Sequence, residues 1–483
     1  MTEPAGAVPP PPDPRDPVRR LFEGDHTLWR DDPTEISDRI GWIPVVGEVW
    51  RVLGPLREHV DKLLDGIDHV LLMGMGGSSL FPEVLTRTFE PSGGHPRLHV
   101  LDTTHPDAIA RVAERCPPER TLHVASSKSG STIETRSHLE WAWSRAAGKG
   151  RFAVITDPDS ELDVLARQRD FPGIFENRPD IGGRYSALSL FGIVPALLMG
   201  LDADALLHGG LEGVEQCGPN TPAASNPGLT LARTMANGVA VGHDKLTFRL
   251  EPEVATFGLW LEQLVAESLG KDGTGLVPLV GERPGPPRVY GEDRRFVELG
   301  VQATPSSIGR AVVVAEVATA LAGAFIGVNP FDQPDVAAAK EATNGVLSQG
   351  DSRVPVTALA ELTDRLQPGW HLALQAFVDP EGPTAAALED VREVLRDRHR
   401  VAVSLGFGPR FLHSTGQLHK GGPQEIVCVQ VHEPAAEDIP IPGRPLGFGE
   451  LLAAQAAGDL KVLQQRGRVA GRVELDELLE VAR

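Results

Sequence analysis

Five hydroxyl side chains and one lysine crowd the stretch Ser126–Thr132, directly after the apolar run Leu122–Ala125. The run has the composition of a β-strand, and a helical pattern begins after Thr132. Free N–H groups and the positive end of a helix dipole point the same way at such a turn, and hydroxyls add donors. The stretch therefore predicts a phosphate-binding turn. A Ser/Thr-rich helix cap is the simpler reading, and the order of a Walker loop is absent.

A carboxylate and an amide stand near the end of the expected helix 257–270. Gln263 and Glu267 are four residues apart, so they share one helix face. Glu262 is five residues from Glu267 and points elsewhere. A partly buried carboxylate at this place has the chemistry of a general base, whereas most glutamates lie on the surface. From the residues alone, both readings stay open.

Arg184 follows the glycine pair Gly182–Gly183 and precedes a long apolar helix that starts near Ala187. An arginine in this position is unlikely to be fully solvated. It serves either as a structural ion-pair partner or as a group that stabilises an anion, and the sequence leaves these alternatives equal.

A second glycine-rich turn, GMGGSS at Gly74–Ser79, follows the apolar run His69–Met73. It lacks the third glycine of a dinucleotide fingerprint, and Asp102 is followed by Thr-Thr-His where an acidic ribose partner would stand. Close approach of backbone to substrate is the better explanation. Further along, Gln333 and Lys340 are seven residues apart, so we expect both to face one cleft from a helix that starts at Pro334.

Strands and helices alternate through the first half of the chain. Expected strands cover residues 69–73, 98–101, 122–125 and 151–155, and expected helices cover 107–114 and 132–146. This rhythm predicts a doubly wound parallel sheet with ligands at the carboxyl ends of its strands. A second block is expected to contain strands 245–250, 277–280 and 289–290 with helices 229–241, 257–270 and 307–326. A smaller third block is expected to contain strands 372–378, 401–405, 426–431 and 469–475 with helices 384–397 and 448–465.

The length of 483 residues predicts more than one domain. We expect a disordered and helical N-terminal arm (1–65), a first α/β domain (66–217), a second α/β domain (218–350) and a C-terminal α/β unit (351–483). The run Ala311–Val328 contains Glu316 and is interpreted as a buried helix, not a membrane span.

The formal net charge of −20 argues against partners such as nucleic acid or an anionic membrane. The three cysteines are far apart and show neither a disulfide framework nor a zinc spacing. The first residues contain no apolar run typical of a signal peptide. The sequence thus predicts a soluble cytoplasmic protein.

Taken together, the motifs resemble those of the glucose-6-phosphate isomerase family. The resemblance rests on GMGGSS, SSKSGSTIET, DIGGRYSALS, QLVAES with LGK, and NPFDQPDVAAAK, in the family's order between Gly74 and Lys340. The tail GFGPRFLHSTGQLHKGG and the entry segment LWRDDPTEISDRIGWI are similar to the isomerase half of actinobacterial transaldolase–isomerase fusions. The resemblance implies two SIS-type (sugar isomerase) domains, a phosphosugar substrate, no cofactor and no metal. Family habit also implies a homodimer, with a monomer as the alternative.

The resemblance also implies roles for individual residues. Glu267 corresponds to the base that moves a proton between C2 and C1 through a cis-enediol, and Arg184 to the cation that stabilises the enediolate. Lys340 resembles a lysine that helps to open the sugar ring. The matching substrate-binding positions are Gly76, Gly77, Ser78, Ser127, Lys128, Ser129, Thr132, Gln263 and Gln333.

One departure concerns the family's ring-opening histidine, which is missing from its place between the base and the FDQ motif. The stretch there reads Phe296-Val-Glu-Leu-Gly-Val, whereas His413-Ser-Thr-Gly-Gln417 occurs after Lys340 and is followed by His419. Our hypothesis is that His413 or His419 reaches the cleft, from the same chain or from a neighbouring subunit. The alternative is that both are structural and Lys340 opens the ring alone.

Three functions compete at this level. The first is interconversion of glucose 6-phosphate and fructose 6-phosphate in glycolysis and gluconeogenesis. The second is a broader isomerase that also accepts mannose 6-phosphate. The third is a sugar-phosphate sensor without catalysis, which would not need Glu267, Arg184 and Lys340.

Overall fold

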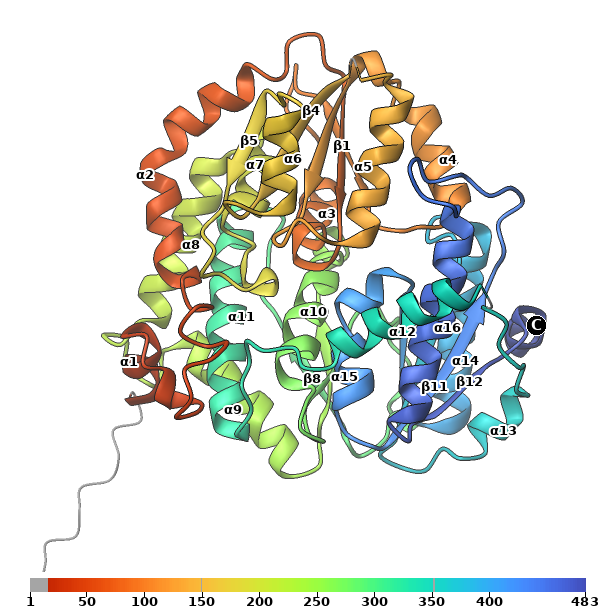
Figure 1. The fold of residues 1–483 in the computed structure, drawn as a ribbon. Helices are drawn as coiled ribbons and strands as arrows, with labels where there is room; N and C mark the ends of the chain where they lie inside the picture. Colours follow the sequence, from red (N-terminus) through yellow and green to blue (C-terminus); the bar gives the residue numbers. More distant parts are fainter. Residues whose placement is uncertain (1–15, 149, 351) are drawn as a thin grey trace, which may run out of the picture.

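The computed structural model describes residues 16–148, 150–350 and 352–483. The side chains of five residues of one helix lie outside this description: Val336, Ala337, Ala339, Lys340 and Gln349. We expect disorder from Met1 to about Pro17. Residues 1–15 lie outside the description, whereas Asp16 and Pro17 begin a helix, Asp16–Phe22, so the expectation is wrong for these two. Figure 1 shows the described chain, with a parallel sheet at the top, a helical layer below it and the C-terminal strands to one side.

The first sheet is parallel throughout and has the strand order β2-β1-β3-β4-β5. Its strands are β1 (His69–Gly74), β2 (Arg97–Leu101), β3 (Thr121–Ser126), β4 (Arg151–Thr156) and β5 (Gly173–Glu176). The connecting helices are α3 (Leu80–Thr88), α4 (Pro106–Arg115), α5 (Ile133–Arg145) and α6 (Glu161–Gln168). The predicted parallel α/β sheet is confirmed, with β5 as an unpredicted fifth strand. Because the chain leaves β1 toward β2 and later returns to β3, the carboxyl ends of β1 and β3 form the switch point where ligands bind.

The second sheet has only three parallel strands, in the order β7-β6-β8. They are β6 (Lys245–Arg249), β7 (Val277–Leu279) and β8 (Arg294–Glu298), and the surrounding helices are α7 (Leu190–Leu198), α8 (Ala203–Cys217), α9 (Pro227–Ala240), α10 (Phe257–Leu269) and α11 (Pro305–Ile326). The expectation of a strand at Val289–Tyr290 is wrong, because Pro287–Val289 forms a 3-10 turn. Consecutive prolines fix φ and remove backbone donors, so the strand forms beyond them.

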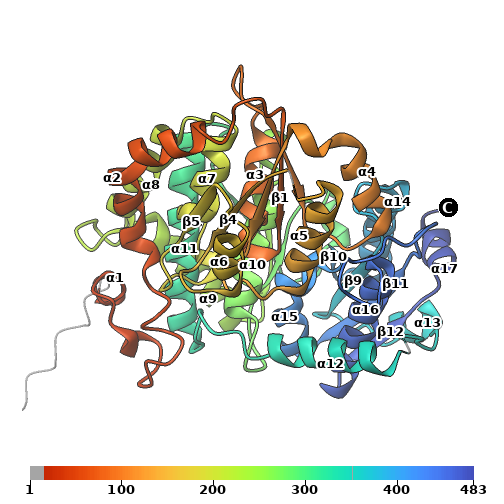
Figure 2. The same ribbon diagram turned by 45° about the horizontal axis from the view of Figure 1, so that its top comes forward.

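The C-terminal sheet has four parallel strands in the order β10-β9-β11-β12. These are β9 (His371–Phe377), β10 (Ala402–Phe407), β11 (Ile426–His432) and β12 (Val469–Arg472). The helices of this part are α12 (Val336–Gln349), α13 (Leu359–Thr363), α14 (Pro383–His399), α15 (Gly416–Gly421), α16 (Phe448–Gln465) and α17 (Leu475–Leu479). Strand β10 contacts β7, and a small apolar cluster that contains Ala266, Ala402 and Leu418 joins the two sheets. Figure 2 shows α12, α15 and α16 beneath the first sheet.

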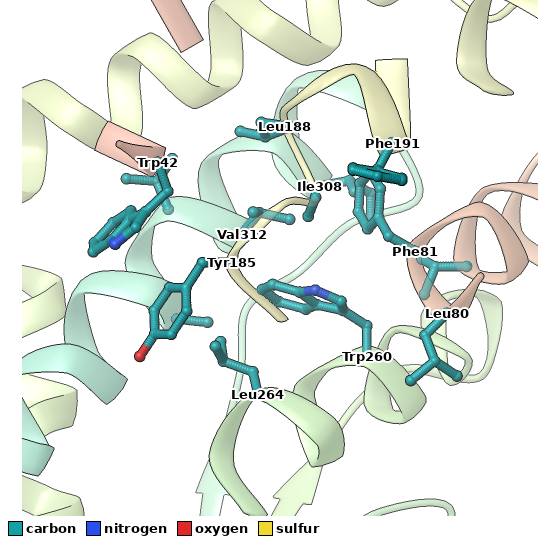
Figure 3. Close-up of a cluster of buried hydrophobic side chains, with 14 of the residues drawn as sticks. Trp42, Leu80, Phe81, Tyr185, Leu188, Phe191, Trp260, Leu264, Ile308 and Val312 are labelled. Atoms are coloured by element: carbon teal, nitrogen blue, oxygen red, sulfur yellow. The ribbon is translucent and has the colours of Figure 1, made fainter. Parts of the chain in front are cut away.

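The N-terminal arm and the first two sheets share one hydrophobic core. This core extends from Val18 in α1 (Asp16–Phe22) to Phe331. At its centre, Trp42 at the start of α2 (Trp42–Asp61) stacks on Tyr185 at 5.2 Å, and Phe81 meets Trp260 edge to face (Figure 3). No break in this core coincides with residues 65 or 217, so the division into 1–65, 66–217, 218–350 and 351–483 remains a prediction.

Helix α11 is long and apolar enough to cross a membrane, by length and composition only, and it is the one such helix in the described chain. It packs against α8, α9 and α10, and 72% of its most apolar window is buried. Burial inside the protein accounts for its hydrophobicity.

Candidate active site

The hydroxyl-rich turn lies between β3 and α5, at the carboxyl end of the first sheet. Its shape is held by internal hydrogen bonds: Ser127 Oγ lies 3.1 Å from Thr132 Oγ1, and the Gly130 N–H donates to Ser127 Oγ at 3.2 Å. Ser129 is exposed, and Thr132 precedes α5 without a side-chain capping bond. The first N–H groups of α5 are therefore available to an anion. Lys128 forms an ion pair with Asp157 and donates to the Pro179 carbonyl at 2.7 Å, so its charge is already partnered.

The turn Gly76–Ser78 brings the other site segments together. A side chain at Gly76 would lie 2.8 Å from the His413 carbonyl oxygen and 2.9 Å from Gln263 Nε2, and Gly76 has a φ of 55°. A side chain at Gly77 would lie 2.0 Å from the Gly183 carbonyl oxygen. Glycine is required at both positions because the backbones approach too closely for a Cβ. Ser78 is buried, and its carbonyl accepts a hydrogen bond from Ser126 Oγ at 3.0 Å.

Glu267 lies on α10 in direct contact with Arg184. The distance from Arg184 Nη1 to Glu267 Oε1 is 2.9 Å, and the two side chains are 3% and 8% exposed. Gln263, one turn earlier on α10, donates from Nε2 to Glu267 Oε2 at 3.1 Å and to the His413 carbonyl at 2.8 Å. Gln263 Oε1 is buried and has no hydrogen-bond partner within the described chain, whereas Arg184 Nη1 is already ion-paired with Glu267. One acceptor beside the carboxylate thus remains free for a substrate.

The backbone of Phe331 and Asp332 closes one side of this cluster. Arg184 Nη2 donates to both carbonyl oxygens, at 2.6 and 2.7 Å, and Lys271 Nζ binds the Asp332 carbonyl and carboxylate at 2.7 and 2.8 Å. Burial, and after it the neighbouring Arg184 cation, lowers the pKa of Lys271 to about 8. Gln333 is exposed and precedes α12, which begins at Val336 and not at Pro334. The expectation that Gln333 lies on one helix with Lys340 is therefore wrong, because Gln333 precedes the helix. The Lys340 side chain lies outside the description.

His413 reaches the same region from the C-terminal unit. Its Nε2 lies 2.8 Å from Oε1 of the buried Glu134, which stands in the first turn of α5. Burial lowers the pKa of His413, but the Glu134 carboxylate outweighs this effect and holds it above its ordinary value. Burial likewise raises the pKa of Glu134, but the His413 cation more than offsets it, so that pKa is lowered. Gln455 on α16 also donates to Glu134 Oε1, at 2.6 Å.

His419 lies elsewhere. It is buried on α15, where Nδ1 is 3.0 Å from Gln375 Nε2 on β9 and the ring lies near His371 and Phe411. Burial, followed by the neighbouring His371, lowers its pKa well below the ordinary value. Of the two candidate histidines, the structure brings only His413 to the cluster around Glu267.

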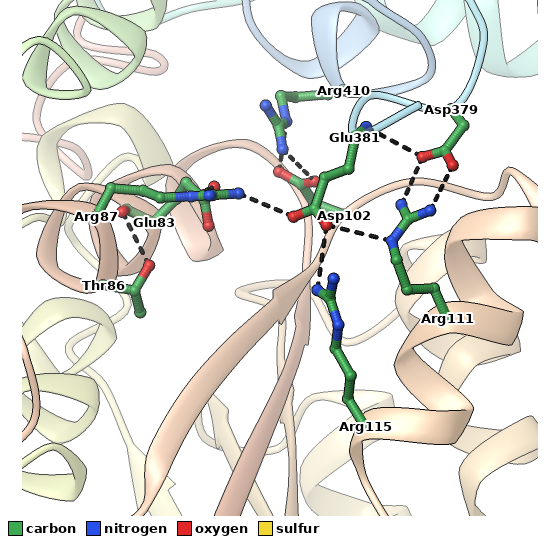
Figure 4. A network of polar contacts seen from close by, with 9 residues as sticks. All are labelled: Glu83, Thr86, Arg87, Asp102, Arg111, Arg115, Asp379, Glu381 and Arg410. Carbon is green, nitrogen blue, oxygen red and sulfur yellow. Dashed lines mark hydrogen bonds and ion pairs between the residues drawn. The ribbon is translucent and has the colours of Figure 1, made fainter. Parts of the chain in front are cut away.

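A network of ion pairs fastens the His413 segment to the first sheet (Figure 4). Arg410, in the 3-10 turn Arg410–His413, binds Asp102 at the end of β2 through two contacts of 2.7 Å. Asp102 is buried, and Arg111 on α4 binds Asp379 through two contacts of 2.5 and 2.6 Å. The C-terminal unit is thus joined to the carboxyl end of β2 by charge-assisted hydrogen bonds.

Sequence reasoning did not single out several of these residues: Glu134, Lys271, Asp332, Gln455 and Asp102 as a partner of Arg410. Glu134 and Lys271 stand inside the quoted motifs SSKSGSTIET and QLVAES with LGK. Their places in those motifs were the available signal. No sequence signal points to Gln455, because 321 residues separate it from Glu134.

Known proteins resemble this chain in sequence and in fold. The model of the family "Phosphoglucose isomerase" matches residues 40–276. A glucose-6-phosphate isomerase of Rubrobacter xylanophilus is 28% identical over 417 residues, which cover 67% of this chain and 96% of the relative. Residues 40–276 belong to the phosphoglucose isomerase family.

Two further relatives extend the comparison. A glucose-6-phosphate isomerase of Nostoc punctiforme is 25% identical over 453 residues, covering 78% of this chain and 83% of the relative. The crystal structure of a glucose-6-phosphate isomerase from Chlamydia trachomatis has a TM-score of 0.53 and 18% identity, covering 69% of this chain and 78% of that one. The structural likeness supports the fold. The family match ends before Phe331 and His413, so those parts of the site rest on the geometry above.

Proposed function

We propose that this protein interconverts glucose 6-phosphate and fructose 6-phosphate, with Glu267 as the base that moves a proton between C2 and C1. The observation that carries the proposal is the buried contact of 2.9 Å between Glu267 and Arg184, beside the unpartnered Gln263 Oε1. A carbon acid next to a carbonyl needs a positioned carboxylate and electrostatic stabilisation of the developing oxyanion. The cis-enediol route needs no cofactor and no metal.

Arg184 and Gln263 are proposed to act on the oxygens of the reacting carbons. The Arg184 guanidinium can stabilise the enediolate oxygen, while Gln263 Oε1 can accept a hydrogen bond from a sugar hydroxyl. The contacts of Arg184 with the Phe331 and Asp332 carbonyls hold its fork in one orientation. A fixed donor is effective because it needs no reorganisation during the reaction.

The phosphoryl group is proposed to bind the turn Ser127–Thr132, with Gly76, Gly77 and Ser78 along the sugar. A short chain of contacts joins this turn to the base. Glu134, two residues after Thr132, binds His413, and the His413 carbonyl binds Gln263, which contacts Glu267. Exposed Ser129 and the uncapped start of α5 offer the phosphate donors. In this proposal Lys128 contributes to substrate binding a positive charge that is already paired with Asp157, and Gln333 contributes an exposed amide.

His413 is proposed to open the sugar ring, with Glu134 maintaining its protonated form. The alternative in which Lys340 opens the ring alone would leave the partly buried His413–Glu134 pair without a role. We also propose a soluble, cytoplasmic protein, a homodimer or a monomer, that binds neither nucleic acid nor membrane. The net charge of −20 supports the last two points.

The test of this function compares Glu267→Gln with Glu262→Gln in a coupled assay that starts from fructose 6-phosphate. Glu262 is on the same helix, and burial raises its pKa to about 8, so glutamine resembles its neutral form. We expect Glu267→Gln to lower kcat by roughly 10²–10⁴-fold and Glu262→Gln to leave it nearly unchanged. Binding of fructose 6-phosphate without turnover by the unmodified protein would instead support the sensor.

A further inference from the structure

Two histidines and a cysteine converge at the amino end of the first sheet, away from the proposed active site. His69 begins β1, His99 lies within β2, and Cys116 directly follows α4. His69 Nδ1 and His99 Nε2 are 3.3 Å apart, and the potential ligand atoms of all three residues lie within 4.8 Å of one another. Since β1 runs from His69 to Gly74, the turn Gly76–Ser78 of the proposed active site lies at the opposite end of this strand.

The spacing of these atoms fits a tetrahedral metal site. Zinc–nitrogen distances of about 2.0–2.1 Å place two imidazole nitrogens about 3.3 Å apart at the tetrahedral angle, and a sulfur at about 2.3 Å lies about 3.6 Å from each. The two imidazoles already have this separation. The Cys116 sulfur needs a shift of up to about 1.2 Å, which a side-chain rotation can supply.

The surroundings allow an ion and a water molecule to enter. His69 and His99 line a cavity of about 710 Å³ between the first sheet and the C-terminal unit, whereas Cys116 is fully buried behind them. The nearest cations in the cavity wall are compensated, because Arg115 pairs with Glu381 at 3.1 Å and Arg97 with Glu90 at 3.3 Å. On the cavity side a divalent cation therefore meets compensated charges, whereas the Arg145 cation lies beside Cys116 on the buried side.

We propose that His69, His99 and Cys116 bind one zinc-like divalent cation, with a water molecule from the cavity as the fourth ligand. Two imidazoles and a thiolate form a ligand set suited to Zn²⁺ and not to Mg²⁺ or Ca²⁺. The bound ion joins β1, β2 and the end of α4. Since it lies at the far end of β1 from Glu267 and Arg184, it stabilises the fold and takes no part in the isomerisation.

Cobalt provides the test, since Co²⁺ reports both tetrahedral geometry and sulfur ligation by its spectrum. Untagged, reduced and chelator-treated protein is titrated with Co²⁺ and then with Zn²⁺. We expect one Co²⁺ per chain, the strong d–d bands of a tetrahedral complex, a sulfur-to-cobalt charge-transfer band, and displacement of all bands by Zn²⁺. Zn²⁺ should also raise the Tm, because a ligand that binds the folded state stabilises it.

Matched variants assign the site. Cys116→Ser should lose the charge-transfer band, and Cys217→Ser, which removes another buried cysteine, should keep it. Should Cys116→Ser fail to fold by circular dichroism, His69→Gln serves instead, because this half-buried residue should weaken Co²⁺ binding without unfolding the chain. No charge-transfer band in the unmodified protein, or the same band in folded Cys116→Ser, would overturn the proposal. Loss of kcat on chelation would overturn the structural role.

Discussion

At the scale of the residue, the pair of His413 and Glu134 controls the proposed ring-opening step. The carboxylate lies 2.8 Å from the imidazole and holds the pKa of His413 above its ordinary value despite burial. A histidine that donates a proton to a ring oxygen is active only while protonated, so the alkaline limb of the pH–rate profile reports this group.

We therefore predict that Glu134→Gln shifts the alkaline limb of kcat/KM to lower pH. Without the Glu134 carboxylate, the effect of burial is no longer offset, and the pKa of His413 falls. The protonated, active form of His413 is therefore lost at lower pH. The value of kcat/KM above neutral pH should fall by roughly 10²-fold. The measurement is the pH–rate profile with anomerically defined glucose 6-phosphate. An unshifted limb would mean that another group, such as Lys340, opens the ring.

At the scale of the element, the segment that carries His413 is held by a partly buried ion pair to the first sheet. Arg410 binds Asp102 at two contacts of 2.7 Å, with side chains 18% and 3% exposed. Removing one partner of such a pair leaves a charge without compensation.

Asp102→Asn should lower the free energy of unfolding by about 3–5 kcal/mol and also lower kcat, because His413 lies in the same turn as Arg410. Asp204→Asn is the matched control, since Asp204 pairs with Arg57 on the surface and should cost about 1 kcal/mol or less. Denaturant unfolding and the coupled assay measure both effects. Equal losses in the two variants would show that the Asp102 pair does not anchor the segment.

Much of the fold could be predicted from the sequence because local patterns decide it. The strands 69–73 and 122–125 were placed correctly by their apolar runs and by the glycine and hydroxyl turns that end them. The spacing of Gln263 and Glu267 likewise put both on one face of α10, where they hydrogen bond. The strand expected at Val289–Tyr290 does not form, because the neighbouring prolines favour a 3-10 turn over the apolar pair's strand preference.

Contacts between distant segments could not be predicted in this way. Glu134 and His413 are 279 residues apart, and Asp102 and Arg410 are 308 apart, so no periodicity links them. The string His413-Ser-Thr-Gly-Gln417 suggested a histidine but could not choose between His413 and His419. The choice depends on tertiary packing, which buries His419 against β9.

At the scale of the whole molecule, one chain supplies the base, the arginine and the histidine of the proposed site. Glu267 lies on α10, and Arg184 lies in the 3-10 turn before α7. Glu134 lies on α5, which follows β3 of the first sheet, and His413 comes from the C-terminal unit. The C-terminal unit is thus part of the proposed active site.

This arrangement predicts that two inactive variants do not complement each other. Glu267→Gln and His413→Ala are mixed, unfolded and refolded together, so that any dimers exchange subunits. If each site is complete within one chain, activity stays at the sum of the two variants. In a dimer that shared sites, mixed dimers would restore about a quarter of the unmodified activity. Such a recovery would show that His413 acts on the neighbouring subunit.

The most direct test of the central claim is a crystal structure of Glu267→Gln with fructose 6-phosphate. We predict phosphoryl oxygens within hydrogen-bond distance of the backbone N–H groups of the turn Ser127–Thr132. The C1–C2 bond should lie against residue 267 and Arg184, with His413 beside the ring oxygen. Sugar phosphate bound elsewhere, such as in the cavity beside Arg111, with the turn empty, would contradict the account.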